Sequence, residues 1–433
     1  MSLVSRLINL GAAGAGGADS AWIAELNNTY NGGTYIELRD AAVDDSGNVF
    51  VGGYTPSTGS YSNNWIMAKF DIDGNHAWTK VQGNSSFVDC RGVAVLSNGN
   101  PVFAGNTYGS SSRDDGLLFL NSSNGAVTAQ RAWDRSGGVS GIDRVFVPSG
   151  TSDIYTTGYF EPADYFTGSS LKKFNSDGSS ITYDKSLDAS VDDGGKDVTV
   201  DSSGNVIVCG YSNNFGSYGG LCLVTKVNSS FTQQWTRSYE TTGSNRFNGV
   251  ATDSSDNIYL AGETQSPGNY AILFKFNSSG TLQWQKYLTS SQKWLDVTVD
   301  ADDYIYAVGH LSEQSIRVAK YNPSGNVEWQ QSITYSTRGI GYSINATSKS
   351  IIITAEIGPS ARRGTTFKLP QDGSITGTYG NYTIANVSGT NANSSLSSAG
   401  SIWTLTNTGF NSQTGALNTG NTNNVTASLT TIA

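Results

Sequence analysis

Charged residues are scarce in this sequence, and they make up 14% of its 433 residues, against roughly 25% in an average globular chain. Acidic residues outnumber basic ones, so the formal net charge is -9. This sign opposes binding to a phosphate backbone, because such binding depends on clustered Lys and Arg. The composition therefore argues against nucleic acid as a partner.

Cysteine and histidine are almost absent. The three cysteines, Cys90, Cys209 and Cys222, cannot form a complete disulfide framework, and they indicate buried thiols in a reducing compartment. The two histidines, His76 and His310, lie far apart without metal-ligand spacing. No nucleophile elbow, zinc-protease motif or phosphate-binding loop appears. The sequence thus predicts no cofactor, no bound metal and no catalytic residue.

Long apolar runs are missing as well. No stretch approaches the roughly eighteen consecutive apolar residues of a membrane-spanning helix, so we expect no membrane span. Glycine is abundant, with 51 residues, and aromatic residues reach 11%. This mixture is typical of strands joined by turns.

The sequence does contain an internal repeat. The segment VTVDSSGNVIVCGYS begins at Val198, variants begin at Ala41, Val250 and Val297, and three weaker copies occur elsewhere. The glycine near the end of each copy, replaced by Glu356 in the last, recurs at intervals of about 47 to 53 residues. Seven units of this length indicate a repeat architecture.

Each unit continues with a second segment, such as AILFKFNSSGTLQW, in which short apolar runs alternate with Gly-containing turns. Runs of this kind predict four short antiparallel strands per unit. Seven four-stranded units predict an all-β protein, a seven-bladed β-propeller. The segments DSSGNVIVCGYS and KFNSSGTLQW resemble the bacterial β-propeller repeat family over roughly residues 20–384. The resemblance implies the fold and no single activity.

The ends of the repeat region indicate how the ring closes. The seventh unit has Gly377 where the other units carry Trp, whereas the N-terminal segment SAWIAELNN contains Trp22. We predict that residues 20–28 form the outer strand of the seventh blade. The alternative is that residues 374–384 complete this blade themselves. The propeller would then span residues 19–384.

Long, variable connections gather on one face of the predicted propeller, and short turns on the other. Variable loops on a rigid scaffold are frequent binding sites, and the long loops carry aromatic side chains suited to glycans or proteins. The predicted ligand or receptor face consists of Tyr61, Tyr108, Tyr165, Phe166, Phe215, Tyr218 and Tyr270. The alternative is that these rings pack on their own blades.

Two kinds of repeated residue have structural interpretations. Four repeated aspartates each precede a turn, where an Asp side chain can accept hydrogen bonds from the backbone amides. We favour this structural role over a cation site. The four residues are Asp44, Asp201, Asp253 and Asp300. The recurring tryptophans are attributed to packing between neighbouring blades rather than to sugar stacking. They are Trp78, Trp133, Trp235, Trp284 and Trp329.

Both ends of the chain suggest assembly. Residues 1–18 predict a short helix with Leu3, Leu7 and Leu10 on one side, followed by a Gly-rich hinge, which would anchor the chain to a neighbouring subunit. Residues 385–433 contain no charged residue, and we interpret them as an arm that adds strands to another sheet, with Trp403 and Phe410 as contacts. Disorder of this arm is the alternative.

The N-terminal segment MSLVSRLINLGAAGAGG, together with the propeller and the neutral arm, resembles structural proteins of marine tailed phages. The resemblance implies a non-enzymatic virion component of the tail, baseplate, fibre or capsid. It would bind other virion subunits through both termini and a host-surface glycan or protein through the long-loop face. Its localisation would be the virion, assembled in the host cytoplasm. A secreted, extracellular bacterial binding module and a polysaccharide-acting enzyme are the alternatives.

Overall fold

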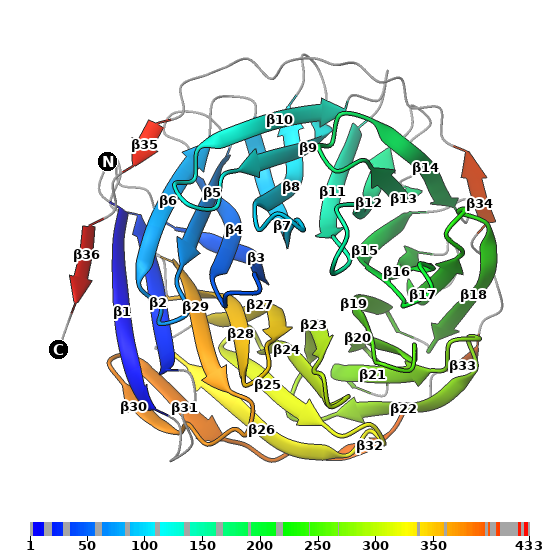
Figure 1. Cartoon of the computed structure of the whole chain (residues 1–433). Coiled ribbons are helices and arrows are strands. Elements are labelled where there is room, and N and C mark those ends of the chain that lie inside the picture. The colour runs from blue at the N-terminus through cyan, green and yellow to red at the C-terminus, as the bar shows by residue number, and fades with distance from the viewer. Residues whose placement is uncertain are drawn as a thin grey trace.

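Each repeat unit folds into a four-stranded antiparallel sheet, and seven such sheets stand around a central axis in the computed structural model (Figure 1). The predicted seven-bladed β-propeller is confirmed. The structure describes residues 3–431, apart from 13–19, 29–34, 57–62, 83–86, 109–112, 134–138, 162–167, 189–191, 214–219, 242, 267, 336–337, 359–361, 395–396, 399–403, 408–422 and 426–427. Within these residues, no helix is long and apolar enough to cross a membrane.

The first strand of each blade lines the axis and the fourth lies outermost. Blade 1 contains β3 (Glu37–Val43), β4 (Val49–Pro56), β5 (Asn63–Phe70) and β6 (His76–Gln82). Blade 2 contains β7 (Phe87–Val95), β8 (Pro101–Tyr108), β9 (Arg113–Leu120) and β10 (Val127–Trp133). Blade 3 contains β11 (Val139–Phe146), β12 (Ile154–Glu161), β13 (Gly168–Phe174) and β14 (Ile181–Asp188).

The remaining blades follow the same order. Blade 4 contains β15 (Asp193–Val200), β16 (Val206–Asn213), β17 (Gly220–Val227) and β18 (Gln233–Glu240). Blade 5 contains β19 (Asn245–Thr252), β20 (Ile258–Thr264), β21 (Tyr270–Phe276) and β22 (Leu282–Leu288). Blade 6 contains β23 (Lys293–Val299), β24 (Ile305–Leu311), β25 (Ser315–Tyr321) and β26 (Val327–Thr334). Blade 7 contains β27 (Gly339–Ala346), β28 (Ser350–Ile357), β29 (Arg363–Pro370) and β2 (Ser20–Asn28).

Strand β2 closes the ring. It pairs antiparallel with β29, and Trp22 lies opposite Lys368, in the position that the repeat spacing predicts for an outer strand. Residues 374–384 do not complete blade 7. Strands β30 (Gly377–Tyr379) and β31 (Tyr382–Asn386) instead form a hairpin on the outer edge of blade 6.

The apolar core is divided among the blade junctions, with one buried cluster between each pair of adjacent blades. An aromatic side chain on an outer strand recurs in this packing. The Trp78 indole N–H donates to the Ser122 carbonyl oxygen of the next blade at 3.1 Å, and Trp22 does the same to Ile72. The predicted role of the tryptophans in packing between blades is confirmed for these junctions.

The same tryptophans explain a recurring glycine. At five junctions a Cβ atom added to the turn glycine would lie 2.6–3.0 Å from the indole ring of the preceding blade. These pairs are Trp22 with Gly74, Trp78 with Gly125, Trp235 with Gly280, Trp284 with Gly325 and Trp329 with Gly373. Each of these glycines also has a positive φ, which glycine adopts without steric cost.

The N-terminal segment differs from the prediction. Residues 3–12 form strand β1 (Leu3–Ala12) rather than a helix, and β1 pairs antiparallel with β2 on the outside of blade 7. Leu7 packs on the cluster between blades 7 and 1, whereas Leu10 belongs to the cluster between blades 6 and 7. These side chains therefore point to opposite faces. The leucine spacing fits a helix, but the open edge of β2 offers a full row of backbone hydrogen bonds.

The C-terminal segment extends the blades of its own chain. Strand β31 pairs with blade 6, β32 (Asn391–Asn393) with blade 5, β33 (Ser397–Ser398) with blade 4 and β34 (Thr404–Asn407) with blade 3. Further along, β35 (Asn423–Val425) pairs with blade 1, and β36 (Ser428–Thr431) runs parallel to β1. Figure 1 shows these strands outside the ring. The arm predicted at 385–433 does add strands, but the edges belong to the same chain.

The turn glycines give a test of the junction packing. We expect Gly280→Ala to lower the free energy of unfolding by about 2–4 kcal/mol, because the added Cβ would lie 2.7 Å from Trp235 in a left-handed backbone. Gly99 has the same φ of +77° but nothing within 4 Å of an added Cβ, so Gly99→Ala should cost only about 1 kcal/mol. Urea denaturation measures both, and equal losses would contradict the packing argument.

Candidate functional site

The innermost strands bring one residue per blade to the axis. Each of these strands contains a register shift against its neighbour, and such irregularities re-aim side chains. The residues that directly follow the shift occupy equivalent positions in the seven blades. They are Asp40, Gly92, Arg144, Asp197, Gly249, Asp296 and Ser343. We refer to this set as the hub.

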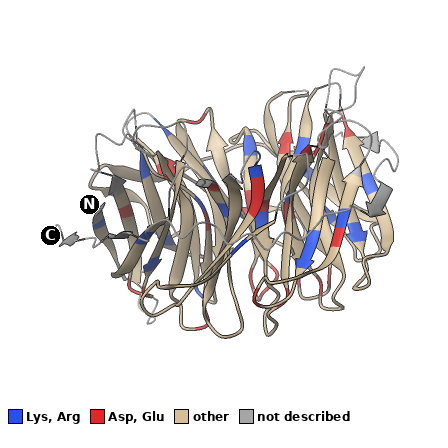
Figure 2. Cartoon of the chain, turned by 90° about the horizontal axis from the view of Figure 1, so that it is seen from above, with Lys and Arg blue, Asp and Glu red and all other residues tan. Residues whose placement is uncertain are grey.

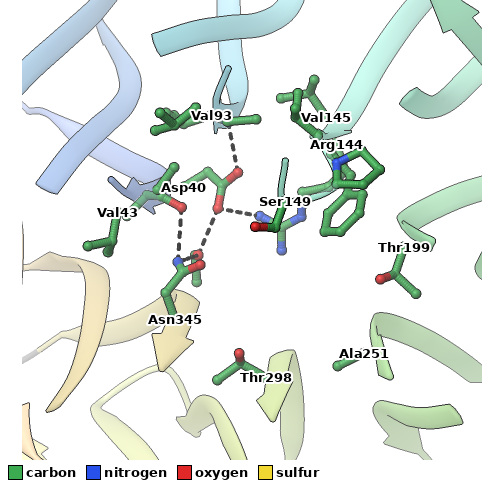
Figure 3. Close-up of a pocket in the computed structure, with 18 of the residues that line it drawn as sticks. Asp40, Val43, Val93, Arg144, Val145, Ser149, Thr199, Ala251, Thr298 and Asn345 are labelled. Atoms are coloured by element: carbon green, nitrogen blue, oxygen red, sulfur yellow. Dashed lines mark hydrogen bonds and ion pairs between the residues drawn. The ribbon is translucent and has the colours of Figure 1, made fainter. Parts of the chain in front are cut away.

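Arg144 is the cation of the hub, and it contacts three carboxylates from three other blades. Its guanidinium lies 2.8 Å from Asp40, 3.3 Å from Asp197 and 3.3 Å from Asp296. All four side chains are at most 12% exposed. Figure 3 shows Arg144 pointing across the axis toward Asp40. One guanidinium thus joins blade 3 to blades 1, 4 and 6.

The hub carboxylates also bind the blades that Arg144 does not reach. Asp40 accepts the Val93 backbone N–H of blade 2 at 2.8 Å and the Ser343 hydroxyl of blade 7 at 2.7 Å. Asp197 accepts the Val250 N–H of blade 5 at 2.8 Å. The hub therefore links all seven blades through charge-assisted hydrogen bonds, which are stronger than neutral ones.

The charges of the hub do not balance, because three carboxylates share one guanidinium. Burial, opposed by Arg144 and reinforced by Asp296, raises the pKa of Asp197 to about 7. Burial also raises the pKa of Asp40 and of Asp296, against the attraction of Arg144. The pKa of Arg144 is raised by the three carboxylates although burial opposes this. The hub consequently holds protons on its carboxyl groups that free aspartates would release.

A cavity of about 780 Å³ lies between the hub and the short-turn face, lined by the innermost strands and their turns. The hub forms its floor, and turn residues such as Asp44 and Asp45 form its rim. Its walls carry mostly small side chains, as Figure 3 shows for Thr199, Ala251 and Thr298. The wall positions two residues after the hub are Ala42, Ala94, Phe146, Thr199, Ala251, Thr298 and Asn345.

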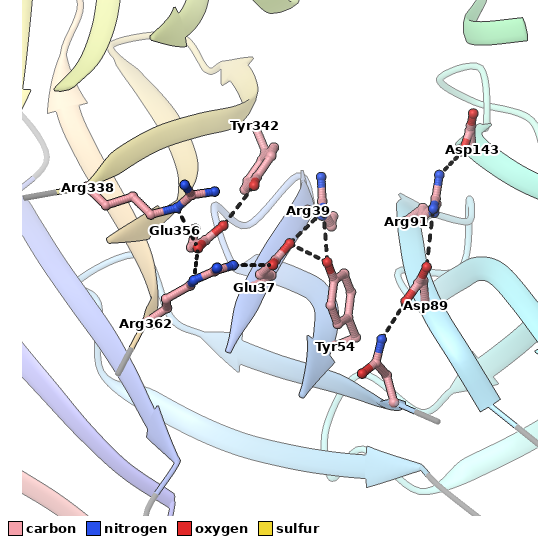
Figure 4. Close-up of polar contacts among 11 residues, drawn as sticks. Glu37, Arg39, Tyr54, Asp89, Arg91, Asp143, Arg338, Tyr342, Glu356 and Arg362 are labelled. Carbon is pink, nitrogen blue, oxygen red and sulfur yellow. Dashed lines mark hydrogen bonds and ion pairs between the residues drawn. The ribbon is translucent and has the colours of Figure 1, made fainter. Parts of the chain in front are cut away.

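The end of the axis toward the long loops carries chains of ion pairs. Arg362 bridges Glu37 at 3.2 Å and Glu356 at 2.9 Å, and Arg338 binds Glu356 at 3.0 Å. Arg91 likewise contacts both Asp89 and Asp143. Figure 4 shows these contacts running between neighbouring blades. The cations at this end are paired with carboxylates, so they brace the ring.

The predicted long-loop face is described at one side chain. Tyr270 stacks on Tyr287 of the same blade, with ring centroids 5.1 Å apart and an interplanar angle of 16°, so this ring packs on its own blade. Tyr108 ends β8, opposite Arg113. The other predicted residues lie outside the described residues, and they are Tyr61, Tyr165, Phe166, Phe215, Tyr218, Trp403 and Phe410.

The repeated aspartates have the turn role that the sequence predicts. Asp44 accepts the backbone amides of Ser46 and Asn48 at 3.0 and 2.9 Å, and the equivalent bonds recur at Asp201, Asp253 and Asp300. Among the described residues, no group of three or more His, Cys, Asp or Glu is placed to hold a metal ion. Figure 2 shows Asp and Glu recurring along the turns of one face.

The remaining candidates for chemistry are buried. The three cysteines are free thiols whose pKa values are raised by burial. Burial lowers the pKa of His310 to about 4, and its Nδ1 accepts the Glu313 N–H. A neutral, hydrogen-bonded imidazole and protonated thiols are structural groups at neutral pH.

The sequence contains a signal for the hub, but it becomes visible only when the seven repeat units are aligned. One column of the alignment, directly before the recurring apolar phrase, reads Asp, Gly, Arg, Asp, Gly, Asp, Ser across the seven units. Three acids and one base in a column of buried strands indicate ion pairing, since isolated buried charges are costly. The column is visible only once the units are aligned residue by residue.

Comparisons with known proteins assign no family to the chain. No family model matches the chain, and no curated protein matches it. The solved structure of Sqt1 from Chaetomium thermophilum is 12% identical, with a TM-score of 0.47 over 78% of this chain and 97% of that one. The periplasmic gluconolactonase PpgL of Pseudomonas aeruginosa is 10% identical, with a TM-score of 0.43 over 75% of this chain and 95% of that one.

An acylaminoacyl peptidase is also similar, with 8% identity and a TM-score of 0.47 over 77% of this chain and 51% of that one. Two of the three names are thus those of enzymes. At these identities and TM-scores, none of their activities or partners transfers to this chain.

The raised pKa of Asp197 predicts a pH dependence of stability. The folded protein holds this proton up to about pH 7, whereas an unfolded aspartate releases it near pH 4. Folding is therefore stabilised at low pH, and this contribution disappears as the pH rises through 7. We expect the free energy of unfolding to fall by roughly 2–4 kcal/mol between pH 5 and 8.

The variant Asp197→Asn cannot ionise and should show a smaller fall over this pH range. Arg144, Asp40, Asp296 and the Cys209 thiol, which are the charged or titratable groups around Asp197, remain unchanged in the variant. Urea denaturation at each pH measures the effect. Identical slopes for the variant and the wild type would contradict the assignment.

Removal of the hub cation should strongly destabilise the folded protein. We expect Arg144→Met to lower the free energy of unfolding by about 3–5 kcal/mol at pH 8, because three buried carboxylates lose their partner. The loss should be smaller at pH 5, where these carboxyl groups take up protons. Arg131→Met is the matched control, since Arg131 and its partner Asp177 are 30% and 59% exposed and such pairs contribute at most about 1 kcal/mol. Equal losses in both variants would refute the hub.

Proposed function

We propose that this protein is a non-enzymatic interaction platform whose central cavity receives a cationic group of a partner. The observation that carries the proposal is the cavity floor, where Asp40, Asp197 and Asp296 share the single charge of Arg144. A cation entering from the short-turn face would supply the missing positive charge. The cavity volume of about 780 Å³ lies within the usual range for ligand sites.

The surroundings of the cavity favour a positive partner. Asp44 and Asp45 line its rim, and the short-turn face repeats acidic turns in several blades (Figure 2). A concave site lined by one sign of charge raises the local concentration of oppositely charged groups. The small wall residues leave room for an extended Lys or Arg side chain.

The same geometry supports a non-enzymatic role. Glycoside hydrolysis requires two carboxyl groups with free oxygens on either side of a bond. The hub carboxylates are instead engaged by Arg144 and by backbone amides, as when Asp296 accepts the Ile344 N–H at 2.9 Å. A carboxyl group held in this way positions neighbouring blades instead of a bond of a substrate.

The setting that we propose for this platform is the virion component inferred from the sequence, with a host-surface glycan or protein and other virion subunits as partners. The described strands of both termini pair within the chain, so the end faces of the ring are the surfaces open to subunits. A secreted, extracellular module is the alternative. Detection of the chain in purified phage particles would support the virion, and a mature protein that begins near Ala21 would support secretion.

The cation site is tested with blocked tripeptides. We expect Gly-Arg-Gly and Gly-Lys-Gly to bind at least about tenfold more tightly than Gly-Gln-Gly by calorimetry at low salt, and the difference to shrink at high salt. Binding should strengthen from pH 6 to pH 8 as the hub loses protons. Equal binding of the three peptides would overturn the proposal.

A variant separates the cavity from the rest of the surface. Ala251→Lys places an ammonium group on the cavity wall and should abolish binding of the basic peptides while the ring stays folded. Thr128→Lys adds the same charge on an exposed position of β10 and should leave binding unchanged. Equal affinities of the two variants for Gly-Arg-Gly would place the interaction elsewhere.

A further inference from the structure

Two blade junctions lack the contact between tryptophan and glycine, and the one between blades 3 and 4 differs in both residues. Between blades 3 and 4, the outer-strand aromatic is Tyr183 instead of Trp, and the turn residue is Phe231 instead of Gly. Phe231 has a φ of 56°, a left-handed conformation that is rare for a bulky residue and costs roughly 1–2 kcal/mol. Both residues of the contact between tryptophan and glycine are therefore different at this junction.

The departure produces a row of parallel rings. Phe231 is 3% exposed, and it stacks on Tyr183 with centroids 4.5 Å apart and an interplanar angle of 7°. Tyr155 is also nearly parallel to Phe231, with ring centroids 6.4 Å apart and an interplanar angle of 5°. Backbone and buried neighbours thus hold the row rigidly.

The outer ring of the row faces solvent. Tyr183 is 37% exposed, whereas the tryptophans at equivalent places in other blades are buried, like Trp22 and Trp78, or half-buried, like Trp235. Its hydroxyl makes no hydrogen bond within the described part of the chain. At four other junctions the indole N–H donates to a turn carbonyl, from Trp22, Trp78, Trp284 and Trp329. Ile72 is the other large apolar side chain that the described part of the chain exposes to this degree.

Polar groups lie on the same face of blade 3 as the exposed ring. Lys173 lies directly across from Tyr183 on β13, so their side chains share one face of the sheet. The Lys173 ammonium binds the Asp153 carboxylate at 2.7 Å, and Asp153 is 45% exposed. The blade face that carries the exposed ring thus also carries a donor and an acceptor, which combines stacking area with groups that fix orientation.

We propose that Tyr183, supported by Phe231 and sharing its blade face with the ion pair of Lys173 and Asp153, is a binding site for a neutral hexopyranose. The carbon-bound hydrogens on one face of such a sugar carry partial positive charge, and they complement the negative face of the aromatic ring. Its hydroxyl groups match the ammonium and the carboxylate. The exposed Asp153 disfavours acidic sugars and nucleic acids, because it repels carboxylate and phosphate groups.

The rigidity of the row is what makes a single exposed ring effective. A stacked, buttressed ring loses little conformational freedom when a ligand covers it, so little of the contact energy is spent on ordering. This explains why a strained Phe231 stands where glycine would fit without strain. The site is independent of the cation cavity, so failure of one leaves the other standing.

Saturation-transfer NMR on the full chain tests the site, with methyl β-glucopyranoside, methyl β-galactopyranoside and cellobiose at millimolar concentration as probes. We expect transfer to the ring hydrogens of at least one probe, binding at least about tenfold weaker in Tyr183→Ala, and binding retained in Tyr183→Phe. No transfer to any probe in the wild type would overturn the proposal.

Two further variants separate binding from folding. Phe231→Gly restores the turn residue of the other blades, so it should keep or raise the melting temperature while it weakens sugar binding through loss of the buttress. Ile72→Ser removes the other exposed apolar side chain and should bind the probes as the wild type does. Unchanged binding in both Phe231→Gly and Tyr183→Ala would refute the site.

Discussion

The ring depends on Arg144, which links the inner strands of several blades across the central axis. Seven sheets around an axis leave their inner strands facing a gap that no single apolar side chain fills. A long guanidinium can reach Asp40, Asp197 and Asp296 in three other blades at once, and its planar fork suits several carboxylates. The two hub glycines belong to the same solution, because a Cβ at Gly92 or Gly249 would lie within 3.0 Å of the next inner strand. Charged side chains therefore extend toward the axis where there is space, and glycine occurs where neighbouring inner strands approach closely.

The outer strands meet a different requirement, which is to give the junction where the chain ends meet the same contacts as an ordinary junction. Lys368 of blade 7 donates to the Ile72 carbonyl of blade 1 at 2.8 Å, as Lys69 does to Ser122 one blade further on. Trp22 completes the same contact from the N-terminal strand. Closure by β2 therefore adds no new chemistry, and the added strands of β1 and the C-terminal arm then cover edges that would otherwise expose unpaired backbone groups.

The sequence predicted the features that recur in most repeat units, and it did not predict the features that occur in only one place. The blades, the packing role of the tryptophans and the turn role of Asp44 follow from recurrence. The strand β1 was missed because three leucines at helical spacing say nothing about the open edge of β2. The arm's strands, such as β33 with two residues, have no pattern of their own, since the blade edges determine their register. The hub was missed because the residue at this position varies among Asp, Gly, Arg and Ser from unit to unit.

Departures from a repeat are therefore more informative about function than its consensus, provided that the ring itself does not require them. Arg144 is the one basic residue among the seven hub positions, and the ring requires it to pair with three carboxylates. Its relevance to binding is that three acidic groups share one positive charge on the cavity floor. Phe231 departs as well, but a glycine beneath a tryptophan satisfies five other junctions. Nothing in closure or packing calls for a bulky side chain in a left-handed backbone. Strain that the fold does not need points to a ligand, and here it supports the one aromatic ring of that row that is turned to solvent.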